Sequence, residues 1–347
     1  HVLTGLRLLE QERFDDAQRE FNLAIELDPK FSMAYSGLGI VHAMKGDFKT
    51  AYAQMEKAED YMKENQEKLD YHVGMIRILS AERGEDWVDK VESQFKKATK
   101  VDENYAPAYY FTGLAYRKAY EFGKAADMFT KVIELNGPYV TEANDEWKLV
   151  QKIQRAAPGT IIGKKIALID KMTRADVAAL FIQELKLAEL YKSRGRKDFD
   201  TSYKSPEKKF VTETIVKMDE ATDIQDHPLK TDIDEVMKIG VRGLEAYPDH
   251  TWHPNELINR AEYAIMIEDI LIKLTGDDSL ATEFVGSKSP FPDLRSDLPY
   301  FNAVMVVTSR GVMEAESLAT GEFNPLGSID GADALLVIRK LKNVLKI

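Results

Sequence analysis

Cysteine is absent from this chain of 347 residues, and so are long apolar runs. Without cysteine, the chain can form neither a disulfide framework nor a thiol nucleophile. No apolar run reaches the roughly 18 residues that a membrane-spanning helix needs. Alternation of apolar and polar residues is scarce, which favours an all-α fold over strands. The hydrophobic content of 44% is enough for two cores at this length.

Positive charge is in deficit, because 47 Lys and Arg face 58 Asp and Glu, for a net charge of −11. Nucleic acid is therefore not an expected partner, since phosphate binding needs a basic face. GTIIGKK at 159–165 lacks the Ser or Thr of a phosphate-binding loop. His250 and His253 lie near Asp249 without completing a metal shell. With no recognisable catalytic triad or nucleotide fingerprint, we expect a non-enzyme without cofactor or metal.

The first half of the sequence repeats itself with a period of 34 residues. Small and aromatic residues recur at this interval: Gly5, Ala17, Phe21 and Ala24 return as Gly39, Ala51, Met55 and Ala58, and Val91, Phe95 and Ala98 return as Ala125, Phe129 and Val132. About six residues are inserted between the two pairs, and Leu79 stands where a glycine is expected. The period is that of tetratricopeptide repeats, which the segment resembles.

This resemblance implies a solenoid of helical hairpins. Small residues let paired helices approach closely and aromatics fill the gaps, since no hairpin can bury its apolar face alone. We expect about four hairpins in residues 1–157, ending in a more polar capping helix near 141–155. The aromatic-rich segment YAPAYYFTGLAY, residues 105–116, is expected to serve repeat packing, while Tyr110 or Tyr116 on a concave face could hold a peptide of a protein partner.

The most informative segment of the second half is YPDHTWHPNELINRAE, residues 247–262. Two turn signals lead to Asn259, and Glu262 three residues later completes the pattern of a capping box. A helix is therefore predicted to begin at Arg260. Its apolar residues recur at helical spacing, so we expect one face to be buried.

The same pattern occurs twice more. The matching positions are Thr173, Arg174 and Asp176 upstream, and Phe323, Pro325, Asp330 and Asp333 downstream. The last two copies each follow an amphipathic helix, expected to end near Gly240 or Gly243 in one case and at Gly311 in the other. The repeated unit is therefore a helix, a turn-rich loop and a second helix.

These three units resemble the S-layer homology family, which implies a pseudo-threefold helical domain whose grooves bind an anionic cell-wall glycan. The resemblance divides the second domain, 158–347, into a truncated first unit at 161–191, an insert at about 192–226, a second unit at 227–275 and a third unit at 290–347. Gly331 replaces the family's arginine in the third unit, which leaves the ligand role of that groove open.

Arginine at a first helical position is disfavoured by the helix dipole by about 0.3–1 kcal/mol, so another interaction is expected to hold it there. A guanidinium beside free helix N–H groups suits a carboxylate or phosphate. Together with the resemblance, this gives the candidate glycan-binding residues Arg174, Arg260, Asp249, Trp252, Thr173 and Asn259. The alternative is structural: the cap residues serve only as helix caps, and Trp252 is buried in the core.

We interpret the chain as a non-catalytic, exported scaffold of a bacterial cell envelope. One half anchors to a cell-wall or surface glycan and the other binds a protein partner. The alternative is a self-assembling surface-layer or envelope-complex subunit, a homo-oligomer whose second half makes protein contacts without glycan. An enzyme of unrecognised type is a third hypothesis. His1 falls inside the first repeat helix, which implies upstream sequence, and any signal peptide or lipid anchor is expected to lie there.

Overall fold

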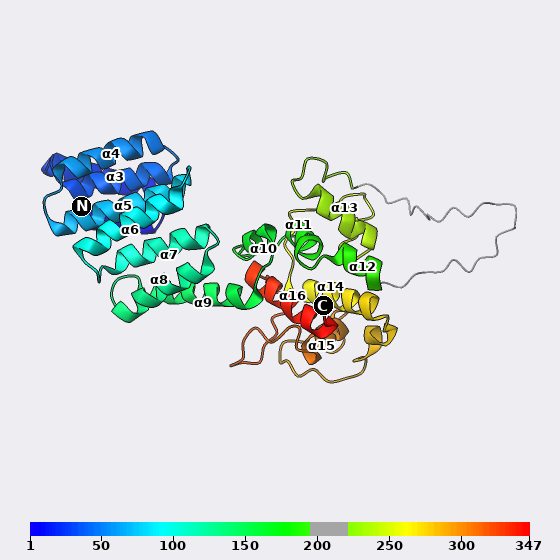
Figure 1. Cartoon of the computed structure of the whole chain (residues 1–347). Helices are drawn as coiled ribbons and strands as arrows, with labels where there is room; N and C mark the ends of the chain where they lie inside the picture. Colours follow the sequence, from blue (N-terminus) through cyan, green and yellow to red (C-terminus); the bar gives the residue numbers. More distant parts are fainter. Residues whose placement is uncertain (195–220) are drawn as a thin grey trace, which may run out of the picture. The chain divides into compact units, whose positions relative to one another are not determined.

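The computed structural model describes residues 1–194 and 221–347, which form helices, turns and two isolated bridges (Figure 1). The all-α prediction is confirmed for this part of the chain. Most of the predicted insert lies outside the described residues. The chain divides into two compact units, 1–154 and 155–347. Among the described helices, none is both long and apolar enough to cross a membrane.

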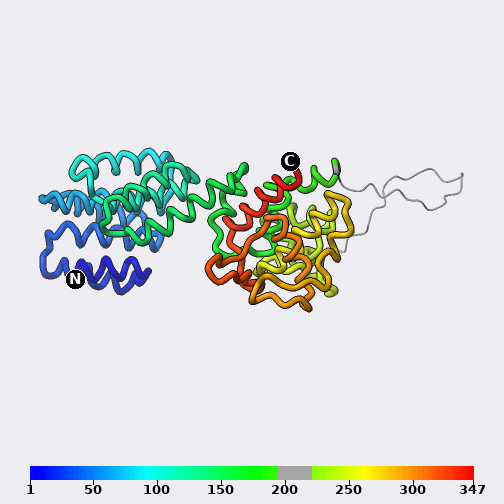
Figure 2. The backbone as a smooth tube through the Cα atoms, turned by 90° about the horizontal axis from the view of Figure 1, so that it is seen from below, coloured from blue at the N-terminus to red at the C-terminus, as the bar shows by residue number. Residues whose placement is uncertain are grey.

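The N-terminal unit is a stack of helical hairpins (Figures 1 and 2). Its helices are α1 (Val2–Glu10), α2 (Phe14–Leu27), α3 (Ser32–Met44), α4 (Phe48–Tyr61), α5 (Asn65–Glu82), α6 (Trp87–Val101), α7 (Ala106–Lys118), α8 (Phe122–Leu135) and α9 (Val140–Ala156). Each odd-numbered helix from α1 to α7 pairs with the next helix in the chain, and α1, α3 and α5 also contact the next odd-numbered helix. Four hairpins result, followed by α9.

Glycines at the repeat position of α1, α3 and α7 lie against a large side chain of the hairpin partner, which is Phe21 for Gly5, Met55 for Gly39 and Phe129 for Gly113. A Cβ added at Gly113 would lie 2.6 Å from the ring of Phe129, which is fully buried. The third repeat has Leu79 at the corresponding position. The aromatic residue of this repeat is Phe95, whose side chain is only half-buried. Its ring packs edge-on against Tyr109, with the two ring centres 5.0 Å apart. The missing glycine therefore coincides with an incompletely inserted aromatic.

Replacing Gly113 with alanine is expected to destabilise the N-terminal unit by about 1–3 kcal/mol, because the added methyl group overpacks the contact with Phe129. Gly123 on α8 is a matched control, since a Cβ there meets its first neighbour only at 3.7 Å. Gly123→Ala should be neutral or stabilise by up to about 1 kcal/mol, as alanine favours helix over glycine. Urea unfolding followed by circular dichroism measures both. Equal effects of the two substitutions would contradict the prediction.

The C-terminal unit contains shorter helices joined by long loops (Figure 1). They are α10 (Ile161–Ile166), α11 (Arg174–Ala179), the π-helix η1 (Leu180–Glu184), α12 (Leu187–Arg194), α13 (Lys230–Ile239), α14 (Arg260–Thr275), the 3-10 helix η2 (Asp278–Thr282), α15 (Phe301–Ser309) and α16 (Gly331–Leu345). Helices α11, α14 and α16 begin where the sequence predicts, and α13 ends before Gly240, whose φ is +72°.

The three predicted caps form. The side chains of Thr173, Asn259 and Asp330 accept the N–H of the residue three positions later at 3.2, 2.9 and 2.7 Å. The capping boxes at Thr173 and Asn259 are reciprocal, because the carboxylate of the third helical residue accepts the cap residue's own N–H at 2.9 Å in each. Short-range capping thus accounts for where these helices start.

The starts of α11, α14 and α16 are connected in a ring. The N–H of Arg174 donates to the carbonyl of Glu256 in the second unit's loop at 2.9 Å. The N–H of Arg260 donates in turn to Gly327 of the third unit's loop at 2.9 Å, and the N–H of Gly331 donates to Ile169 of the first unit at 2.8 Å. Each helix start is therefore held by the loop of another unit, and the third contact closes the cycle.

The first unit has the short helix α10 where the other two have a long loop. Gly331 lies directly against it, because a Cβ there would be 1.7 Å from the carbonyl oxygen of Ile166. An arginine at this position would clash with α10, and it would find no long loop whose carbonyls could accept its hydrogen bonds. The glycine at position 331, where α11 and α14 have an arginine, and the short first unit therefore have a common structural cause.

A fragment comprising residues 159–347 is expected to fold alone, because the C-terminal unit has its own buried core and its ring of contacts closes within it. Limited proteolysis of the full chain should release such a fragment, and circular dichroism should give it a cooperative thermal transition. Recovery of only unfolded C-terminal peptides would contradict this prediction.

Candidate functional site

Arg174 is one of the few buried charged residues of the described chain, with 5% of its surface exposed. Its guanidinium donates from Nε to the carbonyl of Trp252 at 2.9 Å, from Nη1 to Gly243 at 2.7 Å and from Nη2 to Glu245 at 2.9 Å. It also lies 4.7 Å from the centre of the Trp252 ring. The arginine therefore binds the loop of the second unit from within.

Arg260 repeats this arrangement one unit further on. Its Nε donates to the carbonyl of Phe323 at 2.8 Å and its Nη2 to that of Glu314 at 2.7 Å. The guanidinium lies 4.7 Å from the Phe323 ring, and its exposed fraction is 6%. Burial lowers the pKa of Arg260. Arg174 thus donates three hydrogen bonds to backbone carbonyls and Arg260 donates two. These hydrogen bonds hold the arginines at their unfavourable position beside a helix N-terminus.

The other candidate glycan residues also have internal partners. Trp252 is completely buried and donates its indole N–H to the carbonyl of Leu244 at 2.8 Å, so it has no exposed face on which a sugar could stack. Asp249 is exposed and accepts the hydroxyl of Thr251 at 2.6 Å. Thr173 and Asn259 are helix caps. These positions favour the structural alternative for the set, while glycan contact itself stays a prediction.

Two aspartates that sequence reasoning missed organise the same loops. Both oxygens of Asp223 accept backbone N–H groups, from Trp252 at 2.7 Å and from His253 at 2.8 Å. Asp293 accepts from Phe323 at 2.9 Å and Asn324 at 2.6 Å. The signal was present in the sequence, because the aspartate precedes the aromatic by 29 residues in one unit and by 30 in the next.

The charge of Asp223 is stabilised by these donors. Burial alone would raise its pKa, but the N–H groups of Trp252 and His253 hold the pKa below its ordinary value. A carboxyl with a depressed folded-state pKa contributes stability above its unfolded pKa, near 4, and that stability is lost as pH falls through the folded value. The loop of the second unit is therefore expected to loosen under acid conditions.

Asp293→Asn is expected to cost the C-terminal unit about 1–3 kcal/mol, because an amide offers one acceptor where the carboxylate offers two. The exposed Asp297, bound only by Arg295, serves as the control, and Asp297→Asn should change stability by no more than about 0.5 kcal/mol. Fluorescence of Trp252 in a background where Trp87 and Trp147 are phenylalanine reports unfolding of this unit. No difference between the two variants would count against the assigned role.

A cavity of about 260 Å³ lies beside Arg174. Its lining includes the carboxylates of Glu245, Glu256 and Glu262 and the ring of Tyr247. The Tyr247 hydroxyl donates to Glu256 at 2.8 Å, while the Arg174 guanidinium is occupied by carbonyls. Three carboxylates against one engaged guanidinium make the cavity acidic, so its charge disfavours the anionic glycan expected there.

The N-terminal unit carries a second cavity, of about 200 Å³, which we call the inner groove. It is lined from α1, the α2 start, α3, α5 and α7 by Leu9, Glu10, Glu12, Phe14, Met44, Arg77, Ser80, Phe111, Leu114 and Lys118. The odd-numbered helix of every hairpin thus contributes to one surface. Its centre is apolar, with the acidic residues on α1 and its C-terminal loop, and basic residues on α5 and α7.

Tyr110 and Tyr116 do not line the inner groove; their neighbour Phe111 does. Tyr110 is stacked against Tyr139 at 4.6 Å, and burial raises its pKa to about 12. Tyr116 donates to Glu92 on α6 at 2.8 Å beneath the amine of Lys124. Tyr116 therefore belongs to the packing between hairpins, and Tyr110 supports the groove from behind Phe111.

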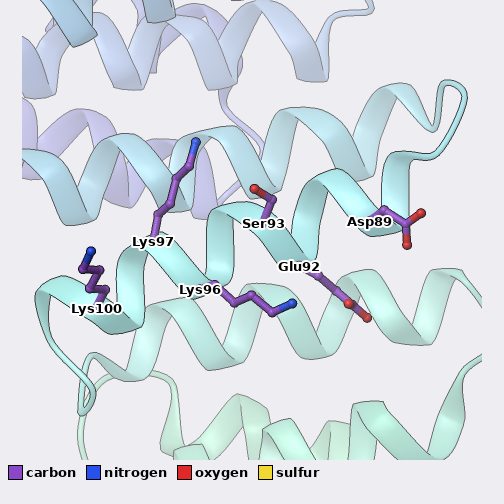
Figure 3. A pocket seen from close by; sticks show the side chains of 6 residues that line it. All are labelled: Asp89, Glu92, Ser93, Lys96, Lys97 and Lys100. Atoms are coloured by element: carbon purple, nitrogen blue, oxygen red, sulfur yellow. The ribbon is translucent and has the colours of Figure 1, made fainter.

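A third depression, of about 510 Å³, lies along α6. All six of its lining residues come from this helix, and their side chains fan outwards rather than converging (Figure 3). They are Asp89, Glu92, Ser93, Lys96, Lys97 and Lys100. This is a charged helix face with no enclosed space, and it supplies control positions for the experiments below.

Comparison with known proteins gives one match. Superkiller protein 3 of Schizosaccharomyces pombe is 29% identical over 181 residues, which cover 46% of this chain and 12% of the yeast protein. No protein-family model matches, and no solved structure does. Together with the repeated hairpins, the match supports a tetratricopeptide-like N-terminal unit.

The match corrects two predictions made from the sequence. The chain was expected to be a bacterial cell-envelope scaffold, or alternatively a surface-layer subunit, located at a bacterial surface. Similarity to a yeast protein contradicts both the function and the location. The residues that suggested them, Arg174 and Arg260, have the internal partners described above.

Proposed function

We propose that the chain is a non-catalytic protein-interaction scaffold whose tetratricopeptide-like unit holds a segment of a partner protein in the inner groove. The observation that carries the proposal is the shared surface of α1, α3, α5 and α7, where Phe14, Met44 and Leu114 remain partly accessible between charged side chains. Apolar grooves with a few placed polar groups are the usual form of recognition sites. Ser80 supplies a hydroxyl there, but it donates to the carbonyl of Ile76 at 2.6 Å, which supports binding rather than nucleophilic chemistry.

The C-terminal unit is, in this proposal, a module of the S-layer homology type without the anchoring role of that family. The ring of contacts between the starts of α11, α14 and α16 supports this assignment. The equivalent placement of Arg174 and Arg260 supports it as well. In such a module, Arg174 and Arg260 hold the loops of the second and third units against the unit that precedes each of them. We therefore assign the module a rigid, structural role.

The test is a random dodecapeptide library displayed on phage and selected on the immobilised full chain. Wild type should enrich a related set of peptides. Leu114→Arg, which fills the inner groove with a charged side chain, should abolish that enrichment. Ser93→Arg, which places the same side chain on the exposed face of α6, should leave it unchanged. Enrichment that survives Leu114→Arg would refute the groove as the binding site.

A further inference from the structure

One end of the inner groove holds more basic side chains than nearby carboxylates pair with. Arg77 pairs with Glu10 at 2.8 Å and Arg117 with Glu146 at 2.7 Å. Lys118 lies at the same end, and the charges that act on it are those of Arg117, Arg83 and Arg77. Within residues 1–154, all of which the structure describes, Lys118 forms no ion pair. A chain of net charge −11 therefore keeps an uncompensated lysine in its groove.

The environment of Lys118 makes its own charge unfavourable. Loss of hydration lowers the pKa of its amine, and the neighbouring guanidinium groups lower it further. A carboxylate beside the amine would oppose both effects, because an opposite charge stabilises the protonated form. The side chain remains accessible, so a carboxylate can reach it from outside.

The space next to Lys118 is apolar. Phe111 and Leu114 come from the same helix, α7, and Leu9 and Met44 face them from α1 and α3. Arg77 covers the Phe111 ring at 4.4 Å, which fixes the ring and leaves the guanidinium at the edge of the apolar area. A volume of about 200 Å³ suits one or two side chains of an extended segment rather than a folded surface.

We propose that the inner groove recognises an extended protein segment in which an acidic residue stands next to a large apolar residue. The carboxylate pairs with Lys118, with Arg83 close by, and the apolar side chain occupies the space beside Phe111. This inference rests on the function proposed above and names the partner's chemistry. A nucleic acid is a poor occupant, because Glu10 and Glu12 also line the groove and would repel its phosphates.

The experiment uses the same phage library on three forms of the full chain: wild type, Lys118→Glu and Lys96→Glu. Lys96 lies on the outward face of α6, so its variant makes the same charge change away from the groove. Peptides enriched on wild type and on Lys96→Glu should carry Asp or Glu next to an apolar residue. On Lys118→Glu this acidic preference should disappear or turn into a basic one.

A synthetic copy of the most enriched peptide allows the contribution of its acidic residue to the binding affinity to be measured. Replacing its acidic residue by the corresponding amide should weaken binding to wild type by about tenfold or more, since hydrogen bonds between charged groups are the strong ones. The same replacement should have about a twofold effect or less on Lys118→Ala, which removes the amine without adding charge. Thermal melts establish that each variant is folded.

The outcomes separate the two proposals. Enriched peptides without acidic preference, or an identical preference on Lys118→Glu, would overturn this inference and leave the groove's function standing, provided that Leu114→Arg still abolishes binding. Peptide enrichment that is unchanged by Lys118→Glu and by Leu114→Arg would overturn both the acidic preference and the groove as the binding site.

Discussion

Arg260→Ala is expected to destabilise the C-terminal unit by about 3–6 kcal/mol. The substitution removes two charge-assisted hydrogen bonds, each worth about 1.5–3 kcal/mol, and leaves the carbonyls of Phe323 and Glu314 without their donor. It also removes a cation from the face of the Phe323 ring. Urea unfolding monitored by Trp252 fluorescence, with Trp87 and Trp147 replaced by phenylalanine, measures the loss for this unit alone.

Arg295→Ala provides the comparison for Arg260→Ala. Arg295 is largely exposed and pairs only with Asp297, and ion pairs of this kind contribute about 0–1 kcal/mol. Arg260→Lys should recover little of the stability, because an ammonium group cannot reach two divergent carbonyls as a planar guanidinium does. A loss below about 1 kcal/mol for Arg260→Ala would mean that the arginine does not hold the loop, and a ligand role would regain weight.

Gly331→Ala is expected to cost about 3 kcal/mol, at or above the upper range for overpacking, because the new methyl group meets backbone rather than a flexible side chain. The carbonyl oxygen of Ile166 would lie 1.7 Å from it, and α10 must move away to relieve the contact. That movement also strains the hydrogen bond from the Gly331 N–H to Ile169, which closes the ring of three units. The same Trp252 fluorescence measurement follows the change.

Gly311→Ala is the matched control for Gly331→Ala. A Cβ at Gly311 has open space around it, but its φ of +66° strains any other residue, so a loss of only about 1 kcal/mol is expected. Gly331→Arg, which introduces the residue that α11 and α14 have at this position, should be at least as damaging as Gly331→Ala. If Gly331→Arg were as stable as wild type, the explanation of the truncated first unit would be wrong.

The sequence predicted the start of α14 because its cause is local. Asn259 and Glu262 are three residues apart, and their mutual hydrogen bonds depend on little else. The repeat in the N-terminal unit was likewise predictable, because the 34-residue spacing places a glycine in contact with a large side chain of its own hairpin, as Gly113 is with Phe129. In the third repeat, where Leu79 replaces the expected glycine, the aromatic residue Phe95 is only half-buried.

The role of Arg260 was not predictable in this way. Its acceptors, Phe323 and Glu314, follow it by 63 and 54 residues, and nothing in the local sequence indicates that their carbonyls turn inward. From the sequence, an arginine beside a helix N-terminus looked like a site for an external anion. The fold supplies the acceptors itself, and the same holds for Arg174.

By itself, the sequence determined the helical class, the hairpin repeat and the starts of α11, α14 and α16, because these depend on spacing, side-chain size and capping within a few residues. Tertiary structure alone decided which charges are neutralised. Arg77 and Arg117 pair with carboxylates 67 and 29 residues away, whereas Lys118, near them in space, has no carboxylate partner among the residues that the structure describes. Electrostatic energy depends on distance through space, so only the folded chain distinguishes a paired cation from one left for a partner.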